Sequence, residues 1–296
     1  MTAPVEVPAW LSIGSRYAVT SDGDKAGVLG EGSFGAVYKG IDIETKAAVA
    51  IKLEAVTARY PQLSYEHKAL QELAGTRGIP RVLYFGPYTT THNALVMERL
   101  GASVGSFAPL PSPKLVAHVA RGLLGVLRYV HRAGIVHRDI KPENLLWEKG
   151  TCADTMGSAR LFLIDFGLCK RVMEEDGRHI PEREGKSFVG TPEYAALRAH
   201  QGRELSRRDD IESMVYVLVY LATKTLPWQR RGAVDDKEIA AAKKRALEDV
   251  EGRLLAGVGN DGLRAALLAT IIYARTTLRF ADMPNFEVLE RYWSML

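Results

Sequence analysis

The sequence predicts an α+β fold with two lobes, a small lobe made of an antiparallel β-sheet with one main helix and a larger helical lobe. With 296 residues, the chain exceeds the length at which one hydrophobic core usually stops growing. Short β-like segments dominate before residue 99, and apolar residues at helical spacing dominate after residue 113. A glycine-flanked connection near residues 99–105 separates the two patterns, so we expect a lead-in over 1–16, the small lobe over 17–99 and the large lobe over 100–296.

The small lobe is predicted to begin with three antiparallel strands between residues 25 and 54. Their apolar runs are separated by glycine-rich and charged turns. A helix is expected over residues 63–73, because leucines recur there at helical spacing before glycine and proline end the pattern. Two further strands are expected at 82–85 and 94–97.

The large lobe is predicted to begin with a long helix after Pro113, which ends at Ala133-Gly134. Apolar residues trace one face of this helix: Leu115, Val119, Leu123, Leu127 and Val130. After it we expect short strands around 144–146 and 161–164, a charged loop, and helices near 209–223, 236–250, 262–274 and 285–293.

Composition excludes several classes of protein. The net charge of +4 is modest and the basic residues are dispersed, so nucleic acid is not expected as a partner. The basic cluster 243–245 fits an exposed helix face better than a nuclear-entry signal. The two cysteines lack metal-site or disulfide spacing, and no apolar run reaches the roughly 18 residues of a membrane span. We therefore expect an intracellular protein, in cytoplasm or nucleus, with no membrane partner. A monomer is the expected state, although no residue pattern in the sequence determines it.

A glycine-rich hairpin is the first motif that carries chemistry. Its glycines allow backbone N–H groups to approach phosphate oxygens without obstruction by a Cβ atom. A dinucleotide-binding fold would place a helix after this loop, whereas a strand follows here. The residues predicted to cover a nucleotide are Leu29, Gly30, Glu31, Gly32, Ser33, Phe34, Gly35 and Val37.

Lys52 and Glu66 are predicted to form a pair. The strand Val49-Ala50-Ile51-Lys52 places an ammonium beneath the hairpin, where it could contact phosphates. Glu66 lies on the apolar face of its helix, and a buried carboxylate needs a partner. Lys52 is the candidate partner, and how that helix packs would then control activity.

The segment 137–144, His-Arg-Asp-Ile-Lys-Pro-Glu-Asn, is the most specific in the chain. Asp139 is predicted to accept or orient the proton of a substrate hydroxyl, and Lys141 to neutralise a transferring phosphoryl group. Asn144 and Asp165, the latter in an Asp-Phe-Gly sequence at the end of an apolar strand, are predicted to hold Mg²⁺. Together these motifs indicate phosphoryl transfer with ATP and Mg²⁺.

The sequence resembles eukaryotic protein kinases from about Tyr17 to Trp293, and within them the casein kinase 1 group, with the vaccinia-related kinases second. The closer resemblance rests on Gly78-Ile79-Pro80, His179-Ile180-Pro181, the segment 206–213, Leu226-Pro227-Trp228-Gln229 and Leu278-Arg279-Phe280. It implies a two-lobed protein kinase fold over 17–296 and an adenine site beside Ala50, Met97, Glu98, Leu100 and Leu146.

The resemblance also implies roles for single residues. Met97 would be the gatekeeper, although core packing is an alternative for Met97 and Leu146. Asp210 would hold the catalytic loop from the long helix, and Thr191 would contact Asp139 and Lys141.

The resemblance implies a serine/threonine protein kinase of casein kinase 1 type, with serine and threonine hydroxyls of protein substrates as acceptors. Lys141, two residues after Asp139, is the arrangement of serine/threonine rather than tyrosine kinases. A pseudokinase scaffold is the alternative, but such proteins usually lose one of the residues Lys52, Glu66, Asp139, Asn144 and Asp165. A small-molecule kinase is disfavoured by the long activation segment with Gly190-Thr191-Pro192.

Glu193 departs from the resemblance, since casein kinase 1 enzymes usually carry an arginine there that is thought to bind a phosphate on the substrate. The charge reversal puts recognition of phosphate-primed substrates in doubt. Arg178, Arg183 and Lys186 could still favour acidic substrates, and a merely solvated loop is an equally good interpretation.

Overall fold

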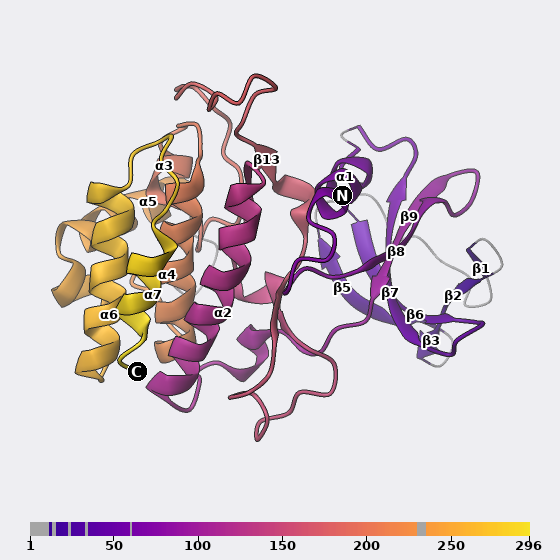
Figure 1. Cartoon of the computed structure of the whole chain (residues 1–296), viewed down its shortest axis with the longest axis horizontal. Coiled ribbons are helices and arrows are strands. Elements are labelled where there is room, and N and C mark those ends of the chain that lie inside the picture. The colour runs from indigo at the N-terminus through magenta and orange to yellow at the C-terminus, as the bar shows by residue number, and fades with distance from the viewer. Residues whose placement is uncertain (1–11, 14–15, 23–24, 33–34, 60, 230–234) are drawn as a thin grey trace. The chain divides into compact units, whose positions relative to one another are not determined.

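The computed structural model describes residues 12–13, 16–22, 25–32, 35–59, 61–229 and 235–296. The chain forms two compact units (Figure 1). Unit 1 comprises Met1–Gly75, Ile79–Leu100 and Asp165–Gly167, and unit 2 comprises Thr76–Gly78, Gly101–Ile164 and Leu168–Leu296. One unit is built on a sheet and the other is mostly helical, which confirms the predicted fold class.

Unit 1 is an antiparallel sheet with one helix. The strands follow the order β1-β2-β6-β7-β9-β8, and β5 lies off this path and pairs with β6. The elements are β1 (Ser12–Ile13), β2 (Tyr17–Val19), β5 (Val28–Gly32), β6 (Gly35–Asp42), β7 (Ala48–Ala55), α1 (Leu63–Glu72), β8 (Val82–Pro87) and β9 (His92–Glu98), with β3 (Ser21–Asp22) and β4 (Lys25–Ala26) forming a separate short ribbon. The predicted strands and helix are confirmed, whereas β1 to β4 were not predicted.

Strand β7 supplies residues to both faces of the sheet, as the period of two in a strand requires. Val49, Ile51 and Leu53 pack into the apolar cluster of one face. The alternate residues Lys52 and Glu54 are also buried. The Glu54 carboxylate accepts hydrogen bonds from the backbone N–H groups of residues 62 and 63, at 2.7 and 3.0 Å, and so fixes the beginning of α1.

Unit 2 is built around helices that pack against one another (Figure 1). Helix α2 contacts α4, α7 and strand β12, and α4 contacts α6. The elements are α2 (Pro113–Arg132), β10 (Ile135–Val136), β11 (Leu145–Trp147), β12 (Leu161–Leu163), β13 (Lys170–Arg171), α3 (Leu197–His200), α4 (Arg207–Thr223), α5 (Asp236–Glu248), α6 (Asp261–Ile272) and α7 (Phe286–Trp293). Every residue of α4 from Arg207 to Val219 is buried, so this helix lies at the centre of unit 2.

Helix α2 has the predicted bounds because both of its ends carry strong signals. Ser112 caps the beginning by accepting a hydrogen bond from the N–H of Leu115, and Pro113 occupies the first turn. Gly134 follows the end with φ +72°, and a Cβ there would lie 2.7 Å from the Met173 side chain. Glycine is therefore required on two grounds.

Helices α5 and α6 end earlier than predicted. Each is followed by a wider π-helical turn, over Val250–Leu254 and Tyr273–Thr277. Asp249 leaves the helical conformation and its carboxylate accepts a hydrogen bond from the N–H of Gly252, which separates the first of these turns from α5.

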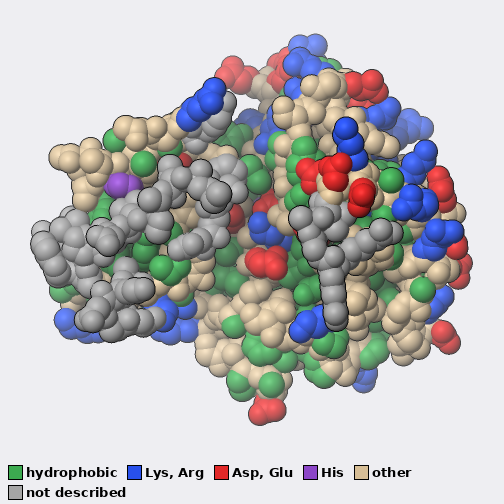
Figure 2. Space-filling view, turned by 180° about the vertical axis from the view of Figure 1, so that it is seen from behind, with side chains coloured by type: hydrophobic (Ala, Val, Ile, Leu, Met, Phe, Trp, Pro, Cys, Tyr) green, Lys and Arg blue, Asp and Glu red, His purple; other side chains and the backbone are tan. Residues whose placement is uncertain are grey.

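Basic and acidic side chains are interspersed on the face of the molecule drawn in Figure 2. Within the described part of the chain, we find no helix that combines the length and the apolar character required to cross a membrane.

Candidate functional site

In unit 1, Lys52 lies between two carboxylates. Its Nζ atom is 2.6 Å from Glu66 Oε2 and 2.8 Å from Asp165 Oδ1. Strand β7 brings the lysine there from the sheet, and α1 brings Glu66 from its buried face. The predicted Lys52–Glu66 pair is confirmed.

The charge of Lys52 is stabilised by its partners. Burial alone would lower the pKa of this amine, but the carboxylates of Glu66 and Asp165 outweigh burial and raise the pKa above its ordinary value. The raised pKa keeps Lys52 charged at neutral pH, as contact with phosphate oxygens would require.

Asp165 has an unusual backbone conformation, with φ +64°. For a residue other than glycine, this region costs roughly 1–3 kcal/mol. The ion pair with Lys52 offsets that cost, and the Asp165 side chain keeps 34% of its surface exposed. At Gly167, a Cβ would lie 3.1 Å from Gln62 Oε1, so a larger residue there would require a small shift of the Gln62 side chain.

The glycine-rich hairpin joins β5 to β6, and Gly32 pairs with Gly35. Gly35 has φ +139°, and a Cβ there would lie 2.3 Å from the Leu53 carbonyl oxygen, so only glycine fits. A Cβ on Gly30 would meet no atom within 4 Å, which leaves this backbone open to a ligand. The predicted nucleotide contacts Ser33 and Phe34 lie outside the described residues.

The predicted adenine-site residues fall in both units. Ala50 and Met97 are cross-strand neighbours in unit 1, where Met97 and Leu100 are buried. Glu98 accepts a hydrogen bond from the N–H of Arg81 at 2.8 Å. Leu146 belongs to β11 of unit 2. Adenine binding by these residues stays a prediction.

In unit 2, Asp139 lies between Lys141 and Thr191. Asp139 Oδ2 is 2.7 Å from Lys141 Nζ, and Oδ1 accepts a 2.7 Å hydrogen bond from the Thr191 hydroxyl. Lys141 also donates to the Thr191 oxygen at 3.1 Å. The expected contact of Thr191 with both residues is confirmed. A carboxylate in this position can accept a proton from a hydroxyl.

Asn144 is oriented by the same loop. Its Nδ2 donates to the Asp139 backbone oxygen at 2.9 Å and to Asp139 Oδ2 at 3.3 Å. With the amide nitrogen bound, Oδ1 is the atom that suits a cation, and Mg²⁺ prefers carboxylate and amide oxygens together with water. Asn144 and the part-exposed Asp165 carboxylate fit that chemistry, each within its own unit. Among the described residues, no three His, Cys, Asp or Glu side chains form a metal cluster.

Asp210 on α4 holds the loop that carries Asp139. Its carboxylate accepts hydrogen bonds from the backbone N–H groups of His137 and Arg138, both at 2.9 Å, and lies 2.8 Å from His131 Nε2. Burial would raise the pKa of this carboxyl, but these hydrogen bonds lower it below its ordinary value. The expected contact with the loop is confirmed. Arg138 has φ +68°, and the two backbone hydrogen bonds help to hold this conformation.

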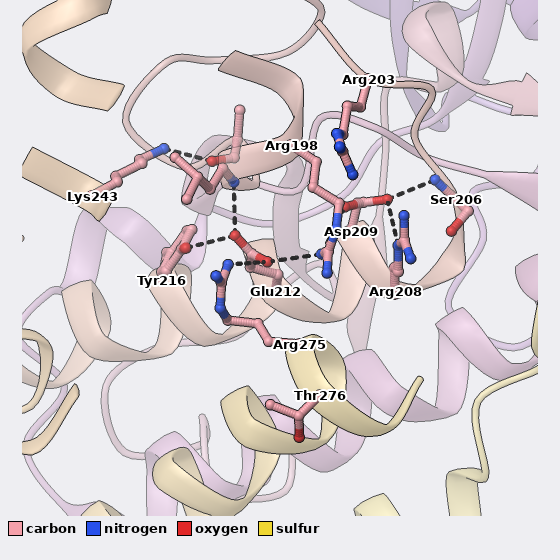
Figure 3. A network of polar contacts seen from close by, with 12 residues as sticks. Arg198, Arg203, Ser206, Arg208, Asp209, Glu212, Tyr216, Lys243, Arg275 and Thr276 are labelled. Carbon is pink, nitrogen blue, oxygen red and sulfur yellow. Dashed lines mark hydrogen bonds and ion pairs between the residues drawn. The ribbon is translucent and has the colours of Figure 1, made fainter. Parts of the chain in front are cut away.

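Glu212 belongs to the segment 206–213 on which the resemblance rests, but no role was predicted for it from the sequence. It lies at the centre of a polar network (Figure 3). Oε1 accepts 2.7 Å hydrogen bonds from the Leu197 N–H and the Tyr216 hydroxyl. Oε2 lies 3.1 Å from Arg275 and 3.3 Å from Arg198. A glutamate inside a helix with so many apolar residues was the available signal, because a buried carboxylate needs partners.

The predicted exposure of the basic cluster 243–245 is wrong at its first residue. Lys244 and Arg245 are exposed, but Lys243 has 0% exposure. Its Nζ donates to the carbonyl oxygens of Pro192 and Ala195, which lie on a different segment of unit 2. These backbone acceptors compensate for burial.

Comparison with known families gives a match that covers most of the chain. The family model described as the protein kinase domain matches residues 24–254, a range that includes residues of both units.

Proposed function

This chain belongs to the protein kinase family, and on that premise we propose that it is an active serine/threonine protein kinase of the casein kinase 1 type. Family membership implies transfer of a phosphoryl group from ATP with a divalent metal ion. The observation that carries the proposed serine/threonine kinase activity is the Asp139 carboxylate, held between the Lys141 ammonium and the Thr191 hydroxyl. The casein kinase 1 type rests on the sequence segments named above. We also propose a single kinase domain over residues 17–296.

Phosphoryl transfer would use the residues of unit 2 as follows. The hydroxyl oxygen of a serine or threonine attacks the γ-phosphorus, the bond from that phosphorus to the β-phosphate oxygen breaks, and the hydroxyl proton passes to Asp139. Lys141, 2.7 Å from Asp139, lies where it could neutralise the charge of the transferring group. Asp210 positions the loop by its two backbone hydrogen bonds.

Nucleotide binding would use the residues of unit 1. Lys52 would contact the α- and β-phosphates, with Glu66 holding its ammonium in place. The backbone of the hairpin 29–37 would cover the phosphates, and Asp165 and Asn144 would hold Mg²⁺, which neutralises phosphate charge when bound. The adenine ring would lie beside the proposed contacts Ala50, Met97, Glu98, Leu100 and Leu146.

Protein substrates follow from family membership, and their sequence preference is part of the proposal. Two of the three basic residues expected to attract acidic substrates already have partners in the protein. Arg178 lies 2.6 Å from Asp176, and Lys186 lies 3.1 Å from Glu204. These ion pairs favour the alternative of a solvated loop, and Glu193 argues against a requirement for phosphate-primed sites.

The test is incorporation of labelled phosphate from ATP and Mg²⁺ into a degenerate array of serine, threonine and tyrosine peptides. We expect signal on serine and threonine peptides, lost in Asp139→Asn and retained in the control Asp154→Asn, which alters an exposed aspartate. An inactive wild-type protein that still binds ATP would instead support a pseudokinase scaffold. Signal on tyrosine peptides alone would contradict the proposed specificity.

A further inference from the structure

Lys243 is a buried lysine on a helix whose neighbouring basic residues are exposed. Helix α5 buries Ile239, Lys243 and Ala246, a spacing that places the lysine on the packed face. Burying an ammonium group is costly unless it is fully hydrogen-bonded. The contacts of this side chain therefore indicate why a lysine occupies the position.

The Lys243 ammonium contacts backbone oxygens and aromatic rings. Nζ is 2.6 Å from the Pro192 oxygen and 2.5 Å from the Ala195 oxygen, and lies 3.2 Å from His200 Nε2. It also lies over two ring faces, 5.2 Å from the Tyr216 centroid and 5.1 Å from that of Trp228. Figure 3 shows the amine directed at this main chain, with Tyr216 and Glu212 nearby.

The contacted backbone is a single turn, residues 191–195, which we call the platform segment. The N–H groups of Tyr194 and Ala195 both donate to the Thr191 oxygen, at 3.0 and 2.8 Å. The Trp228 indole N–H donates to the Glu193 oxygen at 2.8 Å. Lys243 and Trp228, whose side chains touch, thus bind three carbonyl oxygens of this segment.

The platform segment also contacts the loop 137–144, because the hydroxyl of its first residue, Thr191, donates a hydrogen bond to the Asp139 carboxylate. On the basis of the proposed function, we propose that Lys243 is a positioning residue for the protein substrate, which fixes the backbone of the platform segment beside Asp139. The hydrogen-bond partners of Lys243 and the two aromatic rings beside its amine all belong to unit 2. Its loss should therefore weaken peptide binding and leave ATP binding unchanged.

A lysine suits this position better than an apolar residue of the same length. Methionine would fill similar space but would remove the Lys243 donor from the Ala195 oxygen and leave the Pro192 oxygen with His200 Nε2, 3.2 Å away. The amine performs this role in either protonation state, because both forms carry at least two hydrogens for the two carbonyl oxygens. The His200 nitrogen can accept from the charged amine or donate to the neutral one.

The test compares Lys243→Met with Lys244→Met, a matched control at the exposed next position of the same helix. We expect Lys243→Met to raise the KM for a peptide substrate about tenfold or more, the equivalent of losing roughly 1.4 kcal/mol of binding, with the KM for ATP within about twofold of wild type. Amide hydrogen exchange over residues 191–196 should accelerate in Lys243→Met only. The Lys244→Met protein should match wild type in each measurement.

An unchanged peptide KM, or equal changes for peptide and ATP, would overturn the proposal. If Lys243→Met does not fold, Trp228→Phe replaces it, since this variant keeps a ring but removes the donor to the Glu193 oxygen. It should show the same selective rise in peptide KM, and an unchanged value would overturn the proposal as well. If wild type transfers no phosphate at all, the proposed function fails, and the hydrogen-exchange comparison alone decides whether Lys243 holds the platform segment.

Discussion

The surroundings of Lys52 and Lys243, one in each unit, show two ways to bury a lysine. Lys52 contacts two carboxylates, and Lys243 contacts two backbone carbonyl oxygens and two aromatic rings. Burial lowers the pKa of each amine, but at Lys52 the carboxylates outweigh burial and raise it, whereas at Lys243 burial dominates and lowers it to about 7. Full charges keep a buried amine ionised, and carbonyl dipoles hold it in place without doing so.

Removing Lys52 should produce the largest effect of the changes that test this contrast. In Lys52→Met, the carboxylates of Glu66 and Asp165 lose their shared cation, and the proposed phosphate contact is lost. We expect kcat/KM to fall by at least about 100-fold, as for loss of one preorganised electrostatic contact. Steady-state phosphorylation of a peptide checks this, with Lys68→Met, an exposed lysine on α1, as the control. Activity within a few-fold of wild type would remove Lys52 from the proposed mechanism.

The pH dependence of stability should distinguish the two lysines next. For Lys243 the folded-state pKa of about 7 lies below the unfolded value, so between pH 7 and about 10 the unfolded chain binds the extra proton and stability rises with pH. The slope from this group is at most about 1.4 kcal/mol per pH unit. For Lys52 the pKa is raised, so its contribution is complete below the unfolded pKa and is lost only at still higher pH.

Urea unfolding of wild type and Lys243→Met at pH 7, 8 and 9 measures this difference. The variant should lack the upward contribution, so its free energy of unfolding relative to wild type should decline as the pH rises. A constant difference between the two proteins would mean that Lys243 does not titrate in this range.

The prediction of Lys52 and the failure to predict Lys243 have the same physical origin. Lys52 could be predicted because its partner is a side chain, and a glutamate on the apolar face of a helix is visible in the sequence. The partners of Lys243 are main-chain oxygens, which carry no sequence signal, and its neighbours Lys244 and Arg245 suggest an exposed face. Side-chain partners are therefore easier to predict than backbone partners.

The helices and strands that were predicted are also those with a visible signal in the sequence. Strands β5 to β9 and helices α1 and α2 could be predicted from the spacing of their apolar residues and from the glycine, proline and serine residues at their ends. Strands β1 to β4 have two or three residues each, too few to show a period. The π-helical turns after α5 and α6 depend on local capping and packing rather than on composition.

Glu204 shows the reverse of the arrangement at Lys52. Here one buried carboxylate is shared by two part-exposed lysines. It lies 2.6 Å from Lys170 and 3.1 Å from Lys186. Burial would raise the pKa of Glu204, but the hydrogen bonds from these lysines lower it, so its contribution is present above the unfolded pKa and is lost as the pH falls through the folded value. Glu204→Gln should therefore lower the free energy of unfolding at neutral pH by about 1–2 kcal/mol.

The matched control for Glu204→Gln is Glu184→Gln, at an exposed carboxylate 3.0 Å from Arg203. That change should alter the urea midpoint very little, because an exposed ion pair contributes little to stability. Equal losses in the two variants would show that the burial of Glu204 has no energetic consequence.

The contrast between Lys52 and Lys243 is the central physical claim, and an NMR titration of [ε-¹³C]lysine-labelled protein tests it most directly. We predict one lysine signal with a midpoint near pH 7, absent from Lys243→Met, and a second signal, absent from Lys52→Met, that stays protonated beyond the pH at which exposed lysines titrate. A protein in which every lysine titrates at its ordinary pH would contradict the account.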